Sequence, residues 1–359
     1  MGGQSWASRW GTGGFVLLTV AVTLATPYLF SRYAMLQIAI ILVGAILAMS
    51  LGLVWGFGGI MSFGQTAFFG IGGYTYAIAV ENIGDSTLPL LLSIAVPAAV
   101  ALLLGYFMFF GRLGDVFVGV VTLCVSLILF DFGNSTQDPF YTIGDAALNG
   151  FNGMAGIPPL NAPFNPSRTL DTTSMFFLCA GSLIAIYVLC RLTLASRFGR
   201  IAVAVKQNEI RAGLLGYNVA AVKIAIFMVG AGVAGFAGCL YASWNGFISP
   251  GVFGLPMMAQ TIIWVVVGGL GTLIGPILGS VGLQYLVMVL GAAAIVDVNL
   301  VLGLLLIGIV VFLPEGIAPA TRRGLQRLMA ALFLRRRDAA SRRGDSLKAG
   351  LAADRSAKA

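Results

Sequence analysis

The sequence contains no histidine and only four cysteines, and no pair of cysteines forms a C-x-x-C motif. A zinc or haem site built from this chain would therefore have almost no ligands, and we expect the chain itself to bind no metal and no cofactor. The usual catalytic sets of His, Cys or paired carboxylates are missing too. No G-x-x-x-x-G-K-[ST] loop is present to hold the phosphates of ATP. These absences argue against an enzyme.

Charge is also scarce, since charged residues make up 9% of the 359 positions and hydrophobic residues 58%, with a mean hydropathy of +0.96. This composition indicates an integral membrane protein. The 48 glycines suit close helix packing in lipid. Most of the net charge of +8 follows Pro314. The positive-inside rule explains this excess without a nucleic-acid partner, and we expect none.

Two long stretches carry no Asp, Glu, Lys or Arg, one between Arg32 and Glu81 and one between Lys223 and Asp297. A proton-driven carrier or pump normally binds its proton on an ionisable residue inside the membrane. Asp115 and Asp131 lie near span ends, where a solvated position is the simpler interpretation. Energy for any uphill movement would therefore have to come from a partner.

The apolar segments predict an all-α, polytopic helical bundle with about ten transmembrane helices, or eight to ten. The ten predicted spans cover approximately residues 14–30, 34–54, 59–80, 88–110, 116–132, 174–192, 222–244, 257–267, 274–294 and 299–313. Glycine-rich stretches at 56–59 and 268–271 leave a second interpretation open for the third and eighth spans, as re-entrant or broken helices.

Residues 1–320 form the predicted transmembrane domain, and residues 321–359 form a basic tail that we expect to be largely disordered. Two polar segments interrupt the apolar pattern, at 133–173 and at 195–221. The distribution of Lys and Arg over the short loops places 195–221, the tail and both termini in the cytoplasm. The proline-rich segment 133–173 then lies outside.

The polar segment 195–221 is too short for a domain of its own. It predicts a short helix at the membrane surface, with Ile201, Val205 and Leu214 or Leu215 toward the bilayer and the charged side chains toward the cytosol. Such a helix offers a surface that another protein can bind.

Two glycine-rich segments are candidates for a pathway or for helix packing. In the first, residues 56–74, Ser62, Gln65 and Thr66 can offer hydrogen bonds to a polar solute, or can merely satisfy neighbouring backbone. In the second, Gly271, Gly275 and Gly279 form two small-xxx-small steps, for which packing against a helix is favoured.

Several motifs resemble one family. The run GGIMSFGQTAFFGIGG at 58–73 is similar to a signature of the inner-membrane permeases of branched-chain amino-acid ABC transporters, the LivM-like type. The segment 196–219 resembles the cytoplasmic segment of the same family, and shorter matches occur at 149–158, 246–250, 267–276 and 314–317. The resemblance covers residues 35–317 in collinear order.

The resemblance implies a non-catalytic, multi-pass permease subunit of an ATP-driven importer in the bacterial inner membrane. Its solute would be a branched-chain amino acid or a related small polar molecule. The implied partners are a homologous second permease in a heterodimer, two cytoplasmic ATPase subunits that hold ATP and Mg, and a periplasmic solute-binding protein on the loop 133–173.

The candidate site residues fall into three groups, and the resemblance implies the role of the first group. The residues that couple to the ATPase would be Arg197, Arg200, Glu209, Ala212 and Gly216. Those of the translocation pathway would be Ser62, Gln65, Thr66, Phe69 and Tyr74. Helix packing or hinge positions would be Gly58, Gly59, Gly268, Gly269, Gly271, Gly275, Pro276 and Gly279.

Some positions depart from the family pattern. Gln65 stands where many members have His, and Gly213 stands where an acidic residue is common. The segment 264–269 looks somewhat like that of urea-type members, so a urea or short-chain amide permease is an alternative. A stand-alone secondary carrier or channel is a further alternative, which ion-driven uptake by this chain alone would favour.

Overall fold

The computed structural model describes residues 19–21, 23–27, 31–137, 141–162, 165–293, 303–304, 307–308 and 316–318. The predicted first span lies mostly outside these residues, and so do the tenth span and the basic tail. The count of ten spans and the cytoplasmic position of both termini therefore stay predictions.

The described chain is mostly helical. Its longer helices are α2 (Arg32–Gly56), α3 (Gln65–Ile83), α4 (Thr87–Gly105), α5 (Asp115–Ser135), α6 (Thr172–Ala195), α9 (Val219–Asn245), α10 (Leu255–Gly268) and α11 (Ile274–Ala293). A π-helical turn, Tyr106–Phe110, continues α4. Two shorter helices, α7 (Arg197–Gln207) and α8 (Glu209–Leu214), lie between α6 and α9.

Three short antiparallel strand pairs occur in the described part of the chain. They join β1 (Thr142–Ile143) to β2 (Ala146–Ala147), β3 (Met154–Ala155) to β6 (Phe247–Ile248), and β4 (Asn161–Ala162) to β5 (Asn165–Thr169). Single 3-10 turns lie at Gly150–Asn152 and Pro250–Phe253. The predicted loop 133–173 thus carries these strands, apart from β6, and no span.

Six of the described helices are long and apolar enough to cross a membrane: α2, α4 with its π-helical turn, α5, α6, α9 and α11. The protein is therefore a polytopic helical membrane protein, as predicted. The helix α3 has 19 residues but is less apolar. The helix α10 has 14 residues, fewer than the roughly 20 that a perpendicular span requires.

The third predicted span begins later than expected, because α3 starts at Gln65 and not near Gly59. The connecting residues 57–64 are irregular, and Gly59 has a positive φ of 73°, which ends the helical path of α2. The chain is thus interrupted at this glycine-rich segment. In the eighth predicted span, α10 ends at Gly268, and the next residue, Gly269, has a φ of 107°.

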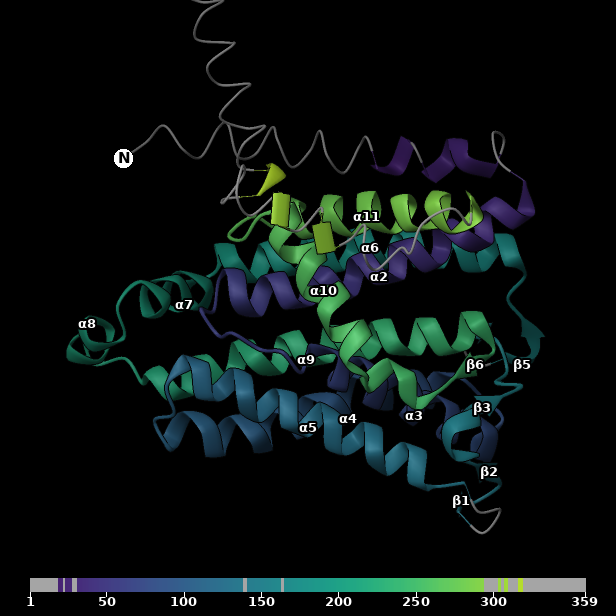
Figure 1. Ribbon diagram of the computed structural model, residues 1–359, viewed down its shortest axis with the longest axis horizontal. Coiled ribbons are helices and arrows are strands. Elements are labelled where there is room, and N and C mark those ends of the chain that lie inside the picture. Colours follow the sequence, from purple (N-terminus) through teal and green to yellow (C-terminus); the bar gives the residue numbers. More distant parts are fainter. Residues whose placement is uncertain are drawn as a thin grey trace, which may run out of the picture.

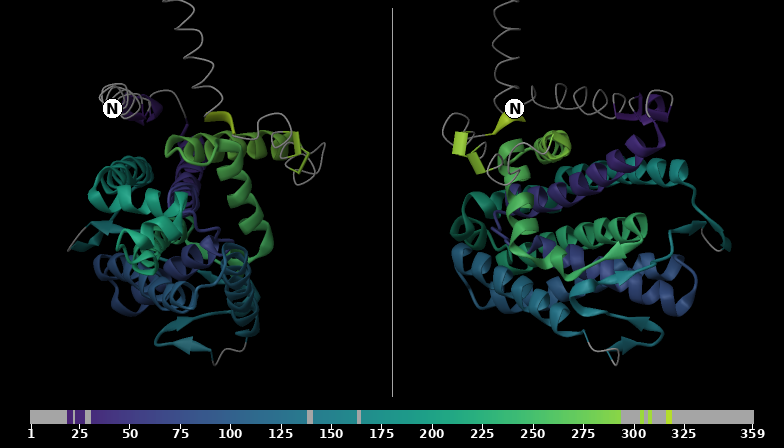
Figure 2. Two further views of the ribbon diagram at one scale, coloured as in Figure 1. Left: turned by 90° about the vertical axis from the view of Figure 1, so that its left-hand side faces the viewer. Right: turned by 45° about the vertical axis from the view of Figure 1, so that its right-hand side comes forward.

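The long helices run roughly along the longest axis of the molecule, with α7 and α8 at one end and the strands at the other (Figure 1). The helix α10 crosses the bundle steeply and joins the layer that contains α11 (Figures 1 and 2). The bundle thus has an α7/α8 end and a strand end.

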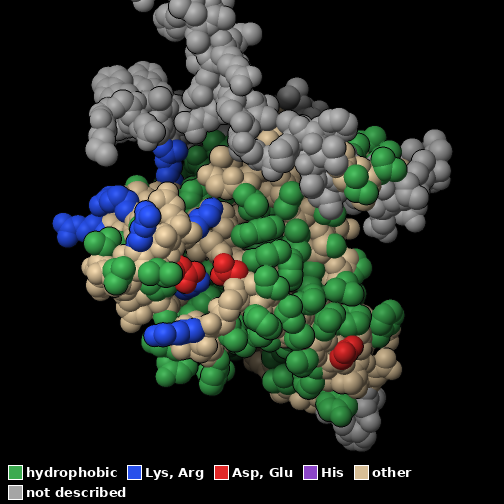
Figure 3. All heavy atoms as spheres, turned by 60° about the vertical axis from the view of Figure 1, so that its left-hand side comes forward, with side chains coloured by type: hydrophobic (Ala, Val, Ile, Leu, Met, Phe, Trp, Pro, Cys, Tyr) green, Lys and Arg blue, Asp and Glu red, His purple; other side chains and the backbone are tan. Residues whose placement is uncertain are grey.

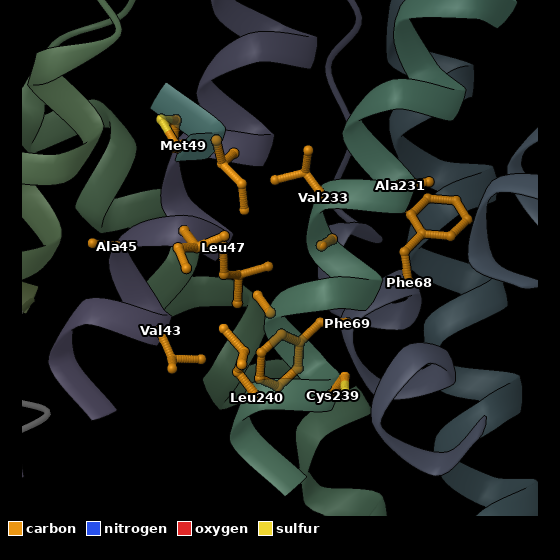
Figure 4. Packing of buried hydrophobic residues seen from close by; sticks show 14 of the residues in the cluster. Val43, Ala45, Leu47, Met49, Phe68, Phe69, Ala231, Val233, Cys239 and Leu240 are labelled. Carbon is orange, nitrogen blue, oxygen red and sulfur yellow. The ribbon is translucent and has the colours of Figure 1, made fainter. Parts of the chain in front are cut away.

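The core lies where α9 packs against α2, α3 and α4. Figure 4 shows Val43 and Leu47 of α2, Phe69 of α3 and Leu240 of α9 lying together in this core. These buried side chains interdigitate, and their close packing provides van der Waals contacts between the helices. The core fixes α3 among its neighbours and so positions the interruption before it.

Candidate functional site

The α7/α8 end is built by three side-chain caps. Ser196 accepts the N–H of Gly199 at 3.3 Å to start α7, Asn208 accepts the N–H of Arg211 at 2.8 Å to start α8, and Asn218 accepts the N–H of Ala221 at 3.1 Å to start α9. The prediction of a single surface helix was therefore wrong. Asn208 is extended, with φ −161° and ψ 104°, and divides the segment into two helices.

The faces of these helices also differ in part from the prediction. Val205 is buried and Ile201 half-buried, so both pack toward the bundle. Leu214 and Leu215 are 83% and 76% exposed, and Ile210 is 77% exposed. Leu214 and Leu215 thus do not share the packed face, because the break at Asn208 changes the direction of the helix.

The exposed apolar side chains of Ile210, Leu214 and Leu215 form a cluster that we call the α8 apolar face. Exposed apolar groups that gather on a short protruding helix are typical of a protein-binding surface. Basic side chains surround this region, and Figure 3 shows them gathered at the α7/α8 end with acidic side chains beside them. Three exposed arginines contribute, Arg197, Arg200 and Arg211.

The predicted coupling residues fall into different environments. Arg197 and Arg200 are exposed on α7, and Arg200 donates to the carbonyl of Ala195 at 2.9 Å. Ala212 is buried on the inner side of α8. Gly216 is exposed and has a φ of 88°, which lets the chain leave α8 and turn toward α9. Glu209 points to the bundle, where its carboxylate pairs with Lys223.

Lys223 forms a charged cluster that sequence reasoning missed. Its side chain is only 8% exposed, and it pairs with Glu209 of α8 and with Asp115 of α5, the latter at 3.6 Å. The ammonium also lies 5.7 Å from the ring centroid of Phe109. The only signal in the sequence was its position as the last charge before a long charge-free stretch.

The Lys223 cluster borders a cavity of about 730 Å³ at the α7/α8 end. Arg112, Glu209 and Tyr217 are among the residues that line it. The cluster ties three elements together at this cavity, because α8 contributes Glu209, α5 contributes Asp115 and α9 contributes Lys223. A displacement of α8 would therefore act on α5 and α9 directly.

Lys206 forms a second link between the α7/α8 end and the bundle. Its amine donates a hydrogen bond to the carbonyl of Gly56, the last residue of α2. Partial burial lowers the pKa of Lys206 below its ordinary value. Gly59 leaves the room for this side chain, because a Cβ there would lie 2.9 Å from Cγ of Lys206. The helix α7 thus contacts the interruption between α2 and α3.

Three predicted pathway residues, Ser62, Gln65 and Thr66, lie together where α3 begins, and all are buried. The Gln65 amide donates to Oγ of Ser50 at 3.1 Å, and Ser50 donates to the carbonyl of Leu47 at 2.6 Å. In the described part of the chain, Ser62 Oγ, Gln65 Oε1 and Thr66 Oγ1 have no hydrogen-bond partner. These groups form a buried polar cluster beside the interruption.

The other two predicted pathway residues lie elsewhere. Phe69 packs against Tyr241, with 5.4 Å between ring centroids, and borders a groove between α2, α10 and α11. Tyr74 stacks on Phe253 at 5.7 Å and borders a cavity of about 200 Å³ between α3 and α5. The five residues therefore do not form one site.

The predicted glycine positions lie at close backbone contacts or at turns. Gly268 and Gly279 leave room for the close approach of α10 and α11, because a Cβ on either would collide with the backbone of the other helix. Pro276 packs against Gly52 of α2, and Gly56 faces the backbone of Gly271. Gly58 lies against Ile226 of α9, and Gly275 approaches the carbonyls of Gly268 and Gly269.

The described residues hold no group of three or more His, Cys, Asp or Glu side chains placed as metal ligands. Three of the four cysteines are buried, Cys179, Cys190 and Cys239, while Cys124 is exposed, and all four are free thiols. The α7/α8 end is linked to the bundle at Lys206 and at Lys223.

Together these features define a multi-pass helical membrane protein with a protruding helix pair at one end. A family model described as the permease component of branched-chain amino acid transport systems matches residues 13–313. The chain therefore belongs to this family of permease components.

Individual relatives agree with this assignment. The chain is 29% identical to the high-affinity branched-chain amino acid transport system permease protein LivM of Salmonella typhimurium, over 87% of this chain and 76% of the relative. LivM of Escherichia coli gives the same identity and coverage. The autoinducer 2 import system permease protein LsrC of Salmonella typhi is 32% identical over 50% of this chain and 52% of its own length. No solved structure gives a significant match.

Proposed function

We propose that this chain is the membrane-spanning permease subunit of an ATP-driven importer in the bacterial inner membrane. It would carry a branched-chain amino acid or a related small polar solute inward. Two ATPase subunits would bind at the α7/α8 end and hydrolyse ATP with Mg. A homologous second permease would complete the pathway, and a solute-binding protein would dock on the loop 133–173.

The α8 apolar face is the observation that carries this proposal. Ile210, Leu214 and Leu215 are more than 75% exposed, although they belong to a short helix that is firmly capped and paired to the bundle. An exposed apolar face on a fixed helix suits a partner that grips it and pushes it as a rigid body. The long charge-free stretches of the bundle favour the same conclusion, because they offer few sites for a driving proton.

The assembly is tested by replacing one residue of the α8 apolar face. Leu214→Asp should abolish or strongly reduce co-purification of the ATPase subunits, since it places a charge in the buried centre of the proposed contact. Leu214 is 83% exposed, so the bundle should fold normally. Ile143→Asp, an equivalent change at a 51% exposed position in β1, should leave ATPase binding intact.

The transport activity is tested by reconstituting the complex in vesicles and measuring uptake of radiolabelled L-leucine, urea and acetamide with and without ATP. The proposal expects ATP-dependent uptake of L-leucine. Preferential uptake of urea or acetamide would instead assign the alternative solutes. Uptake by this chain alone, driven by an ion gradient without ATPase subunits, would contradict the proposal.

A further inference from the structure

A groove of about 290 Å³ lies between α2, α10 and α11, and each of these helices contributes one glutamine to its wall. The three residues are Gln37 of α2, Gln260 of α10 and Gln284 of α11. Its volume is near the lower end of the roughly 300–1,000 Å³ of ligand pockets, so it suits a small solute. The rings of Tyr241 and Trp264 border it as well.

The groove lies away from the α7/α8 end. The helix α2 contacts Lys206 at Gly56, its last residue. Gln37 precedes Gly56 by about 28 Å along the helix axis, at 1.5 Å per residue. Apolar side chains such as Ile40, Met257 and Val287 surround the glutamines. The wall therefore combines uncharged polar groups with apolar ones, and the described residues that line it include no charged side chain.

The amides of two of the glutamines are held in place. Gln284 donates to the carbonyl of Ile41 at 3.3 Å, and Gly44 makes room for it, because a Cβ at Gly44 would lie 2.7 Å from its Oε1. Gln37 donates to the hydroxyl of Tyr33 at 3.3 Å. Among the described residues Gln260 has no hydrogen-bond partner, although it is half-buried.

Amide side chains are costly at membrane depth unless they face a polar cavity or partner. Each primary amide offers two donors and a carbonyl acceptor. Three amides from three helices can therefore bind both a carboxylate, through N–H groups, and an ammonium, through carbonyl groups. Phe69, Met288 and Trp264 in the same wall suit an aliphatic side chain.

We propose that this groove is a solute-binding site of the translocation pathway. It takes a small molecule with no net charge that carries donors and acceptors beside an apolar part. The proposal rests on the function proposed above and deepens it, since it names the residues and the solute class. A zwitterionic amino acid and a neutral amide share this chemistry, and the experiments separate them.

Gln260→Leu is the decisive variant, because it removes no hydrogen bond within the described chain. In the full complex it should raise the half-saturating concentration for L-leucine uptake by about tenfold or more, as expected for losing a hydrogen bond to a charged group. Gln260→Asn should restore part of the affinity. Unchanged uptake kinetics in Gln260→Leu would contradict the proposal.

Thiol labelling tests whether the groove is open to solute. We expect Gln260→Cys, in a variant with the four native cysteines replaced by alanine, to react with a small membrane-impermeant thiol reagent. L-leucine should slow the reaction if the solute is an amino acid, and acetamide or urea if it is a neutral amide. Ala259→Cys, an exposed neighbour in α10 that does not line the groove, should show no such protection.

The outcomes separate this proposal from the proposed function. Loss of the second permease from purified Gln260→Leu complexes would make the groove a subunit interface and overturn the site. Normal ATP-driven uptake with no solute protection of Gln260→Cys would overturn the site alone. Absence of ATP-driven uptake in the wild-type complex would overturn the proposed function. Protection of Gln260→Cys by solute, in the variant that lacks the native cysteines, would still support the groove as a binding site.

Discussion

The nearly buried ammonium group of Lys223 forms ion pairs with two partly exposed carboxylates, those of Glu209 and Asp115. A cation at such a position needs partners, because removing it from water costs several kcal/mol unless ion pairs compensate. Glu209 is the nearer partner and belongs to α8, so the pair anchors the helix that carries the α8 apolar face. The carboxylates are 47% and 60% exposed, which keeps the energy of each pair modest.

Replacing Lys223 should loosen α8 without unfolding the bundle. Lys223→Met removes both ion pairs and should cost roughly 1 kcal/mol, or about a fivefold increase in local opening. Hydrogen exchange of residues 209–217 measures this opening. Glu209→Gln should have a similar effect and Asp115→Asn a smaller one, because Asp115 lies farther from the amine. A larger effect of Asp115→Asn than of Glu209→Gln would contradict this assignment.

Gly59 is a second position where one residue affects the link between the α7/α8 end and the bundle, because it lies against Lys206. Gly59→Ala should destabilise the protein by about 1–2 kcal/mol, because its φ of 73° is unfavourable for any residue with a Cβ. The new methyl group would also press on Lys206. Thermal unfolding in detergent measures the change.

Gly213→Ala is the matched control for Gly59→Ala. Gly213 lies in α8, and a Cβ there would meet no atom within 4 Å. It should leave the unfolding temperature nearly unchanged. Equal effects of the two substitutions would show that the backbone of residue 59 adopts another conformation.

For single residues, the sequence predicted whether a segment is charged or apolar better than it predicted which side chains form ion pairs. The lack of charge in the bundle and the basic nature of residues 195–221 follow from composition alone. The pairing of Lys223 with Glu209 and Asp115 does not, because Asp115 is far from the other two in the chain and Glu209 lies on a different helix from Lys223. Only the packing of α5, α8 and α9 brings them together.

Among the helices, α3 and α9 approach each other closely in the core. Gly72 faces Gly235, and Gly238 faces the carbonyl of Phe69, with no space for a side chain at any of these contacts. Small residues at such positions let two helix backbones touch over several turns, which is a major source of helix association in lipid. This contact with α9 holds α3 in place directly after the irregular residues 57–64.

Gly238→Ala should therefore separate α3 from α9. The added methyl group would collide with the backbone of Phe69, and overpacking of this kind costs about 1–3 kcal/mol. Gly181→Ala in α6 is the matched control, because a Cβ there would meet nothing within 4 Å. We expect a lower unfolding temperature in detergent for Gly238→Ala and an equal or slightly higher one for Gly181→Ala.

A reversed order of these two temperatures would contradict the packing of α3 against α9. Uptake should fall in Gly238→Ala in proportion to the folded protein that remains. A loss of uptake at full stability would instead assign Gly238 a role in movement.

Helix bounds were predicted within a few residues where long apolar runs define them, as in α4, α5 and α9. The interruptions were predicted less well. The start of α3 at Gln65 and the break at Asn208 depend on local backbone geometry and caps, which hydropathy does not detect. The short helix α10 reads as a span from its composition, yet its steep crossing of the bundle follows from its neighbours (Figure 2).

Over the whole molecule, the two ends of the bundle differ in chemistry. The α7/α8 end carries Lys206, Lys223 and exposed arginines, and the groove with three glutamines lies in the opposite half. The sequence could not reveal this groove, because Gln37, Gln260 and Gln284 converge only through the fold. It drew attention to Gln65 instead, whose amide already binds Ser50.

The orientation of the bundle in the membrane is the prediction that belongs to the whole molecule. The excess of Lys and Arg around α7 and α8 predicts that this end lies in the cytoplasm and the strand end outside. In the variant with the native cysteines replaced by alanine, Thr142→Cys in β1 should react with a membrane-impermeant thiol reagent in intact spheroplasts. The side chain of Leu215 is 76% exposed, and Leu215→Cys should react only after the membrane is permeabilised. Labelling of Leu215→Cys from outside would reverse the bundle and place the α8 apolar face out of reach of any cytoplasmic ATPase.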